Sequence, residues 1–147
     1  MQIKILKTAE EKNKAYELRK EVFVIEQNVP LTLELDDKDK LKTTFHFGVF
    51  IENNLVATAR VLNATTKNVH IGRVAVKKEY RKQNIGKILL LEIERVLTIM
   101  NTKTLTSNLS AQIQVEDFYK KLGYRRKNNK TYLDAGIEHI DMYKILN

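Results

Sequence analysis

The chain has 147 residues, a formal net charge of +8 and no cysteine. This length fits one domain with a single core, which we expect to span residues 1–147. The lack of cysteine excludes disulfides, thiolate metal sites and cysteine nucleophiles, and three scattered histidines give no basis for a metal site. Because no apolar run reaches membrane-spanning length and the first residues do not resemble a signal peptide, we expect a soluble, cytoplasmic protein.

The charges are segregated along the chain. Residues 77–87 carry five basic side chains and residues 120–130 carry six, whereas residues 26–39 carry five acids. A lysine-rich solvated surface accounts for part of this pattern, but the segregation also suggests one site for an anion and another for a cation. Nucleic-acid binding is an alternative that we disfavour, because the basic segments lack interleaved exposed aromatic side chains.

The first half of the chain predicts one helix followed by three strands. Thr8 and Glu11 form a capping box, and apolar residues follow at helical spacing as far as Ile25. Pro30, the only proline, closes this element and opens an acidic loop. Alternation over residues 44–76 then predicts an antiparallel meander, with a tight turn at Asn53-Asn54.

The second half predicts alternating helices and strands. A wide apolar stripe over residues 85–100 predicts a long helix with one buried face. A short strand at residues 104–109 follows, then a helix at 115–122 that ends at Gly123, and two strands near 131–133 and 139–145. The fold class is therefore mixed α/β with a largely antiparallel first half.

The segment Y-R-K-Q-N-I-G-K, residues 80–87, joins the third strand of the meander to the long helix. The first amides of a helix have no partner within it, and together with the helix dipole they bind phosphate oxygens. Asn84 and Gly86 stand where such a turn needs residues that allow close backbone approach. The segment alone fits a basic helix start equally well. It matches neither a Walker loop nor a Rossmann fingerprint.

Four blocks in order resemble the GNAT (Gcn5-related) N-acetyltransferase superfamily. The family pattern Q/R-x-x-G-x-G/A corresponds to R-K-Q-N-I-G, preceded by I-G-R-V-A-V-K-K-E-Y, and F-Y-K-K-L-G-Y resembles a second recurrent block. The front segment V-F-V-I-E-Q-N-V-P and the late segment A-G-I-E-H-I-D-M resemble one small bacterial subgroup of predicted acyltransferases. Asn84 is the clear departure, because it replaces a glycine of the pattern.

The resemblance implies a twisted, mostly antiparallel sheet of six to seven strands, splayed at a parallel pair and flanked by about four helices. It implies acetyl-CoA as the acyl donor, bound between the strands at residues 69–76 and 104–109, with no metal. Pantetheine would contact the backbone of Val74 and Val76, and the pyrophosphate would contact the turn. The cofactor-binding residues implied are Val74, Ala75, Val76, Arg81, Lys82, Gln83, Asn84, Ile85, Gly86, Lys87, Asn108, Gln112 and Tyr119.

For catalysis, the resemblance places Tyr119 near the sulfur of CoA, where a phenol can protonate the departing thiolate. Glu26 and His139 are candidates for the base that takes a proton from the amine. Candidate acceptor-binding residues are Glu26, Asp36, Asp37, His46 and Arg73. If Arg60 and Arg73 point inward, they must be paired, either to order the acidic loop or to receive an anionic acceptor.

The leading hypothesis is thus an enzyme that transfers an acyl group from acyl-CoA directly to a primary amine in a ternary complex. The absence of cysteine excludes a cysteinyl-acyl intermediate. The alternative is a non-catalytic module that binds CoA as a sensor or partner subunit. The acceptor stays open among polyamines, amino sugars, antibiotics, amino acids and protein amines, and the resemblance leaves room for a homodimer.

Overall fold

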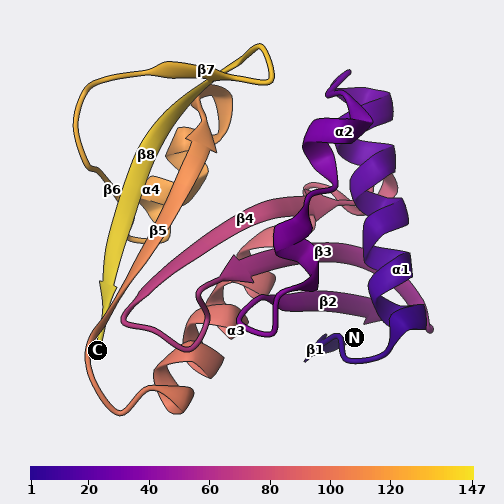
Figure 1. Ribbon diagram of the computed structural model, residues 1–147, viewed down its shortest axis with the longest axis horizontal. Coiled ribbons are helices and arrows are strands. Elements are labelled where there is room, and N and C mark those ends of the chain that lie inside the picture. Colours follow the sequence, from indigo (N-terminus) through magenta and orange to yellow (C-terminus); the bar gives the residue numbers. More distant parts are fainter.

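The computed structural model describes all residues, 1–147, as one eight-stranded sheet with helices packed against it (Figure 1). The strand order is β1-β2-β3-β4-β5-β8-β6, with β7 also paired to β8, and β4–β5 is the parallel pair. The elements are β1 (Gln2–Ile5), α1 (Ala9–Arg19), η1 (Lys20–Glu26), α2 (Leu31–Glu34), η2 (Asp37–Lys40), β2 (Phe45–Ile51), β3 (Asn54–Leu62), β4 (Asn68–Val76), η3 (Lys78–Tyr80), α3 (Ile85–Met100), β5 (Leu105–Gln112), η4 (Ile113–Val115), α4 (Glu116–Lys121), β6 (Arg125–Arg126), β7 (Tyr132–Asp134) and β8 (Ile137–Leu146).

This arrangement confirms the mixed α/β class and the splayed parallel pair, with more strands than expected. The sheet has eight strands rather than six to seven, because the short strands β1 and β6 add to its edges. The meander over β2, β3 and β4 is confirmed. Its first turn lies one residue earlier than predicted. Glu52 and Asn53 have φ values of 50° and 67°, and Asn54 already pairs with Ile51 as the first residue of β3.

The first helix begins as predicted and changes from α to π geometry at Lys20. Thr8 Oγ1 accepts a hydrogen bond from the Glu11 amide at 3.1 Å, and the Glu11 carboxylate accepts one from the Thr8 amide at 3.4 Å. From Lys20 to Glu26 the chain continues as a π-helix. In this segment Val22 and Phe23 line a cleft, whereas Ile25 is 68% exposed.

The two faces of the sheet are covered by different helices. The stripe of α3 buries Ile85, Leu89, Ile93 and Leu97 in the main core, where they pack with alternate residues of β2, β3 and β4. On the other face, α1 packs through smaller apolar clusters that include Phe50 and Ala75. Since successive residues of a strand point to opposite faces, β3 is buried on both sides.

A cleft opens where β4 and β5 separate. Their parallel pairing ends at Ile71 and Leu109, although both strands continue beyond these residues. In β4, Gly72 and Ala75 are three positions apart, whereas their partners on β3, Arg60 and Thr58, are two positions apart. Arg73 occupies this bulge with a φ of 52°. Figure 1 shows β4 and β5 diverging toward the top of the view, where β7 and α2 stand on opposite sides of the opening.

Candidate active site

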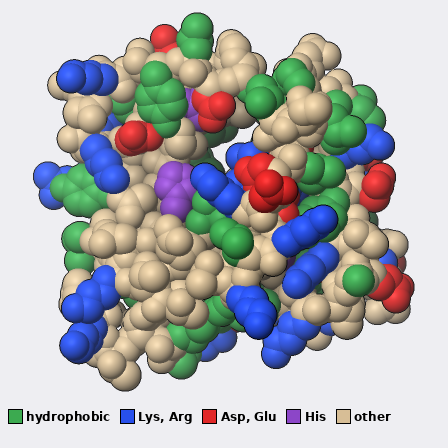
Figure 2. Space-filling model, in the orientation of Figure 1, with side chains coloured by type: hydrophobic (Ala, Val, Ile, Leu, Met, Phe, Trp, Pro, Cys, Tyr) green, Lys and Arg blue, Asp and Glu red, His purple; other side chains and the backbone are tan.

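The opening between β4 and β5 leads into a cleft of about 940 Å³. Its walls come from the far end of β4, the start of α3, α4, the end of β5, the β7–β8 turn and the η1–α2 region. Figure 2 shows a hollow on this face between the side that carries β7 and β8 and the side that carries α2. A volume of this size is in the range of small-molecule and cofactor sites.

One end of the cleft is the start of α3. Asn84 precedes the helix in the left-handed conformation, with φ 63° and ψ 14°, as its position in place of a glycine requires. No side chain caps this helix start, so its first amides are free to bind a ligand. Arg81, Lys82 and Lys87 line the cleft here, and together with the helix dipole they favour an anion.

Gly86 lies in the first turn of α3, close to two apolar side chains. A Cβ atom on this residue would lie 3.5 Å from Phe118 Cζ and 3.7 Å from Val76 Cγ2. These are ordinary contacts, so alanine fits, whereas a branched side chain has no room without displacing Phe118 or filling the turn. The glycine therefore keeps the helix start accessible.

Tyr119 projects from α4 into the cleft wall. Its side chain is 8% exposed, and its ring packs edge-on against Phe118 and Tyr124 at centroid distances of 5.1 Å and 6.0 Å. Its hydroxyl has no hydrogen-bond partner in the protein. Because the residue lines the cleft, this hydroxyl is available to a ligand. Burial raises the pKa of Tyr119 to about 12. At neutral pH the phenol is therefore protonated and can donate a proton or a hydrogen bond.

Two histidines line the cleft. His139 Nδ1 lies 2.6 Å from the Ile137 carbonyl oxygen, which can only accept, so Nδ1 carries a proton and Nε2 is the ring nitrogen left to accept one. The ring stacks on Tyr132 at a centroid distance of 6.0 Å. His70 lies on β4, and burial lowers its pKa below the ordinary histidine value. His139 thus has its tautomer fixed in the form that can accept a proton.

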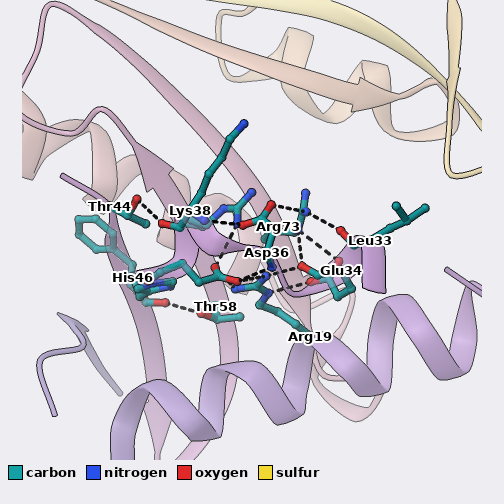
Figure 3. Close-up of polar contacts among 12 residues, drawn as sticks. Arg19, Leu33, Glu34, Asp36, Lys38, Thr44, His46, Thr58 and Arg73 are labelled. Atoms are coloured by element: carbon teal, nitrogen blue, oxygen red, sulfur yellow. Dashed lines mark hydrogen bonds and ion pairs between the residues drawn. The ribbon is translucent and has the colours of Figure 1, made fainter. Parts of the chain in front are cut away.

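The acidic loop is held by arginines rather than left open to the cleft. Arg19 donates to Glu34 Oε1 at 2.8 Å and to Asp39 Oδ1 at 2.7 Å (Figure 3). Arg60 donates to Asp36 Oδ1 at 2.8 Å and to Asp39 Oδ1 at 3.1 Å. Arg73 lies 3.2 Å from Glu34 Oε2 and 3.4 Å from Asp36 Oδ2. We call these six residues the acid–arginine cluster; it comprises Arg19, Arg60, Arg73, Glu34, Asp36 and Asp39.

The acid–arginine cluster balances three carboxylates with three guanidinium groups. Burial would raise the pKa of Asp39, but the hydrogen bonds and charges of Arg19 and Arg60 outweigh it and hold this pKa below its usual value. Glu34 is buried more deeply, at 3% exposure, and burial raises its pKa in spite of Arg19. The carboxylates of Glu34, Asp36 and Asp39 are thus paired with arginines and offer no free negative charge to a cationic amine.

Many of the predicted site residues meet in the cleft, and six do not. The lining includes Arg73, Val74, Ala75, Val76, Arg81, Lys82, Asn84, Ile85, Gly86, Lys87, Gln112, Tyr119 and His139. The residues outside the lining are Glu26, Asp36, Asp37, His46, Gln83 and Asn108.

Five of the six residues outside the lining have a side-chain partner elsewhere, and the sixth, Asp37, is exposed. The geometry therefore supports no direct role in the cleft for these side chains. Glu26 pairs with Arg81 at 2.5 Å, and Gln83 donates to the Glu79 carbonyl at 3.3 Å. Asn108 donates to the Val69 carbonyl at 3.1 Å, where β4 and β5 are still paired. His46 is buried at 1% exposure beside Asp39, and Asp36 belongs to the acid–arginine cluster.

The cleft also contains polar residues that the sequence did not single out. Gln27, Ser110, Gln114 and Asp134 line it, together with His70. Gln112 donates to Gln27 Oε1 at 2.9 Å, which links the end of β5 to the end of η1 across 85 residues of sequence. Gln27 follows Glu26 directly in the V-F-V-I-E-Q segment, so that motif held the signal for it.

The buried His46 predicts a pH dependence of stability. Burial lowers the pKa of His46, although the contact with Asp39 partly opposes this. The unfolded chain therefore binds a proton below pH ~6.5 that the folded chain resists, and stability falls as the pH falls from 7 toward 5. The slope from this group is at most about 1.4 kcal/mol per pH unit. Urea unfolding at pH 5–7.5 should show a shallower slope in His46→Gln, with a residual slope from His70. An unchanged slope would contradict this account.

Residues 21–146 match the acetyltransferase (GNAT) domain family. The chain therefore belongs to the GNAT family and is an N-acetyltransferase of that family. It is 33% identical to the uncharacterized N-acetyltransferase YjcF of Bacillus subtilis, over 98% of this chain and 99% of the relative.

Two solved structures show the same fold at 27% identity. Escherichia coli ElaA superposes with a TM-score of 0.87 over 98% of this chain and 99% of its own. An acyl-CoA N-acyltransferase from Pseudomonas aeruginosa superposes with a TM-score of 0.86 over the same shares of the two chains. None of the helices has the length and apolar character that crossing a membrane requires.

Proposed function

We propose that this protein is a single GNAT domain, residues 1–147, which transfers the acetyl group of acetyl-CoA to a primary amine by direct attack in a ternary complex. The observation that carries the proposal is the cleft between the splayed strands β4 and β5. It brings the uncapped start of α3, the buried phenol of Tyr119 and the free Nε2 of His139 into one space.

The residues present fit CoA. Past Ile71, β4 is no longer paired with β5, so the backbone of Val74 and Val76 is available on that side for the amide groups of pantetheine. The turn from Arg81 to Lys87 offers helix amides, left-handed Asn84 and basic side chains for the pyrophosphate. CoA supplies the activated thioester, and these residues orient it.

The transfer needs two proton movements, and the cleft holds a group for each. His139 Nε2 takes a proton from the ammonium form of the acceptor, directly or through a water, so that the amine can attack. A C–N bond then forms at the thioester carbon and the C–S bond breaks. Tyr119 donates its phenolic proton to the departing sulfur, and the proton released by the amine replaces it through solvent.

The turn at α3 can be tested by CoA binding. CoA at about 100 times its dissociation constant should stabilise the wild type by about 2.7 kcal/mol, because a ligand that binds only the native state raises its stability. Asn84→Gly should retain this binding, since glycine adopts the same left-handed conformation freely. Gly86→Val should weaken it about 10- to 100-fold, because losing one charge-assisted hydrogen bond to the pyrophosphate costs about 1.5–3 kcal/mol.

Gly86→Ala is the matched control, because its Cβ makes only ordinary contacts with Phe118 and Val76. It should bind CoA more tightly than Gly86→Val in calorimetric titrations. If all three variants bound CoA like the wild type, the turn would be only a helix start.

A further inference from the structure

Arg73 has an unusual position in the fold. It sits on the bulge of β4, two residues past Ile71, the last residue of β4 that pairs with β5. Its φ of 52° lies in the left-handed region, which residues other than glycine, asparagine and aspartate rarely adopt. The bulge turns a guanidinium group into the wall of the cleft at the point where the strands open. A strained backbone that places a charge in a reaction cleft suggests a role for that charge.

The contacts of Arg73 leave part of its guanidinium group unused. Nε donates to the Glu34 carbonyl at 3.2 Å, and Nη2 donates to the Leu33 carbonyl at 3.1 Å and to Asp36 at 3.4 Å (Figure 3). Nη1 makes no hydrogen bond in the protein and is not among the buried unpaired atoms, in contrast to Nε of Arg60. The side chain is 25% exposed. One face of the guanidinium group is therefore fixed by α2, and Nη1 is free to bind a ligand.

The charge of the cleft favours an anionic group on the acceptor. Five basic residues line the cleft, Arg73, Arg81, Lys82, Lys87 and Lys121, against two acids, Glu34 and Asp134. Glu34 is already paired with Arg19, so it has little charge to offer a ligand. Arg81, Lys82 and Lys87 belong to the turn that we assign to the pyrophosphate. Away from that turn, Glu34 and Asp36 are already paired with arginines that include Arg73, so no free carboxylate remains on the α2 side to attract a polycationic acceptor.

The wall next to Arg73 is apolar. Val22, Phe23, Val29 and Leu33 line the cleft from η1, the following loop and α2. Val22 and Val29 are 5% and 8% exposed, and Leu33 is 54% exposed at the margin. A cation with a free donor beside an apolar wall matches a small molecule that carries a carboxylate next to an apolar side chain.

We propose that the amine acceptor is a free amino acid with an apolar side chain, whose carboxylate binds Nη1 of Arg73. This inference rests on the proposed function, because it names the acceptor for the same cleft. Arg73 is then a specificity-determining residue: it holds the carboxylate, and the neighbouring amino group is thereby presented toward the reaction centre. Attachment of Arg73 to α2 fixes the orientation of the guanidinium group, so less side-chain freedom is lost when the carboxylate binds Nη1.

The test compares acceptors that differ only at the carboxylate. L-leucine, L-leucinamide and isopentylamine share the amine and the apolar side chain, and spermidine represents the polycations. We expect kcat/KM to be highest for leucine and lowest for spermidine. Arg73→Gln should lower kcat/KM for leucine by about 10- to 100-fold, as expected for loss of a hydrogen bond to a charged group. It should change kcat/KM for leucinamide far less.

The ratio of leucine to leucinamide, measured in each variant, separates the carboxylate contact from other effects. Removing the carboxylate also changes the basicity of the amine, but that change is the same in wild type and variant. If Arg73 had a purely structural role in holding α2, its replacement would lower kcat/KM equally for leucine and leucinamide and leave their ratio unchanged. Arg73→Lys should restore part of the preference for leucine, and Arg95→Gln, on the exposed side of α3, should leave the ratio unchanged.

Two outcomes would overturn the inference: a wild-type preference for leucinamide or spermidine, or an equal ratio in wild type and Arg73→Gln. Thermal unfolding with and without CoA accompanies each variant, so a misfolded protein is recognised. If the wild type acetylated none of these amines and CoA gave no stabilisation, the proposed function itself would fail. Stabilisation by CoA together with turnover of only the amines that lack a carboxylate would reject the carboxylate site alone.

Discussion

Replacing Arg19 by alanine should lower the free energy of unfolding by about 3–5 kcal/mol, because it leaves two buried carboxylates without their principal partner. Arg19 is 1% exposed and donates four hydrogen bonds, to both carboxylates and to the Glu34 carbonyl. It joins the end of α1 to the α2–η2 loop, so its loss also releases a wall of the cleft. Urea unfolding at pH 7 measures the change.

Two further variants show what the cluster contributes. Arg19→Lys keeps the charge but cannot make the four directed hydrogen bonds of the guanidinium group, so it should still be clearly destabilised. Arg95→Ala removes an exposed arginine paired with Glu92 at 2.6 Å, and no resolvable change is expected. A loss below about 1 kcal/mol for Arg19→Ala would contradict the view that this arginine holds the loop.

Tyr119→Phe should lower kcat by about 10²- to 10⁴-fold, the usual contribution of a positioned general acid. The ring fills the same space against Phe118 and Tyr124, so folding and CoA affinity should be retained. Because burial raises the pKa of Tyr119 to about 12, no activity should be lost through deprotonation of this phenol below pH ~10. Steady-state release of CoA thiol, measured with a fixed amine, gives the ratio of kcat values.

Tyr124→Phe is the matched control for this prediction. The Tyr124 hydroxyl hydrogen-bonds with Ser107 at 2.8 Å inside the core, and the residue does not line the cleft. Its loss should reduce stability and leave kcat within a few fold of the wild type. Equal kcat values for wild type and Tyr119→Phe would assign protonation of the sulfur to solvent instead.

The sequence predicted best the features that neighbouring residues determine. The capping box at Thr8 needs only Glu11 three positions later, and the left-handed Asn84 follows from the chemistry of a single residue before a helix. The meander and the long helix α3 follow from periodicity. The short strands β1 and β6 were missed, because four and two residues carry too little pattern and gain their structure from pairing with β2 and β8.

The acceptor side of the cleft was predicted less well, because it depends on residues far apart in sequence. Arg19, Arg60 and Arg73 reach acids that lie 15 to 39 positions away. The sequence suggested a site for a cation near Glu26, Asp36 and Asp37, and only the structure shows that Asp36 is paired with Arg60 and Arg73, and Glu26 with Arg81. Resemblance to the family implied the CoA turn as a single contiguous segment, whereas it offered no such segment for the acceptor.

We propose above that this chain transfers an acetyl group from acetyl-CoA to an amine. The most direct test of this claim is the release of CoA thiol by the wild type at neutral pH, with and without a primary amine, and with mass detection of the N-acetylated product. We predict thiol release that depends on the amine and matches the product in amount. Saturable CoA binding without amine-dependent thiol release from any member of a broad amine panel would contradict the claim and would indicate a CoA-binding module instead.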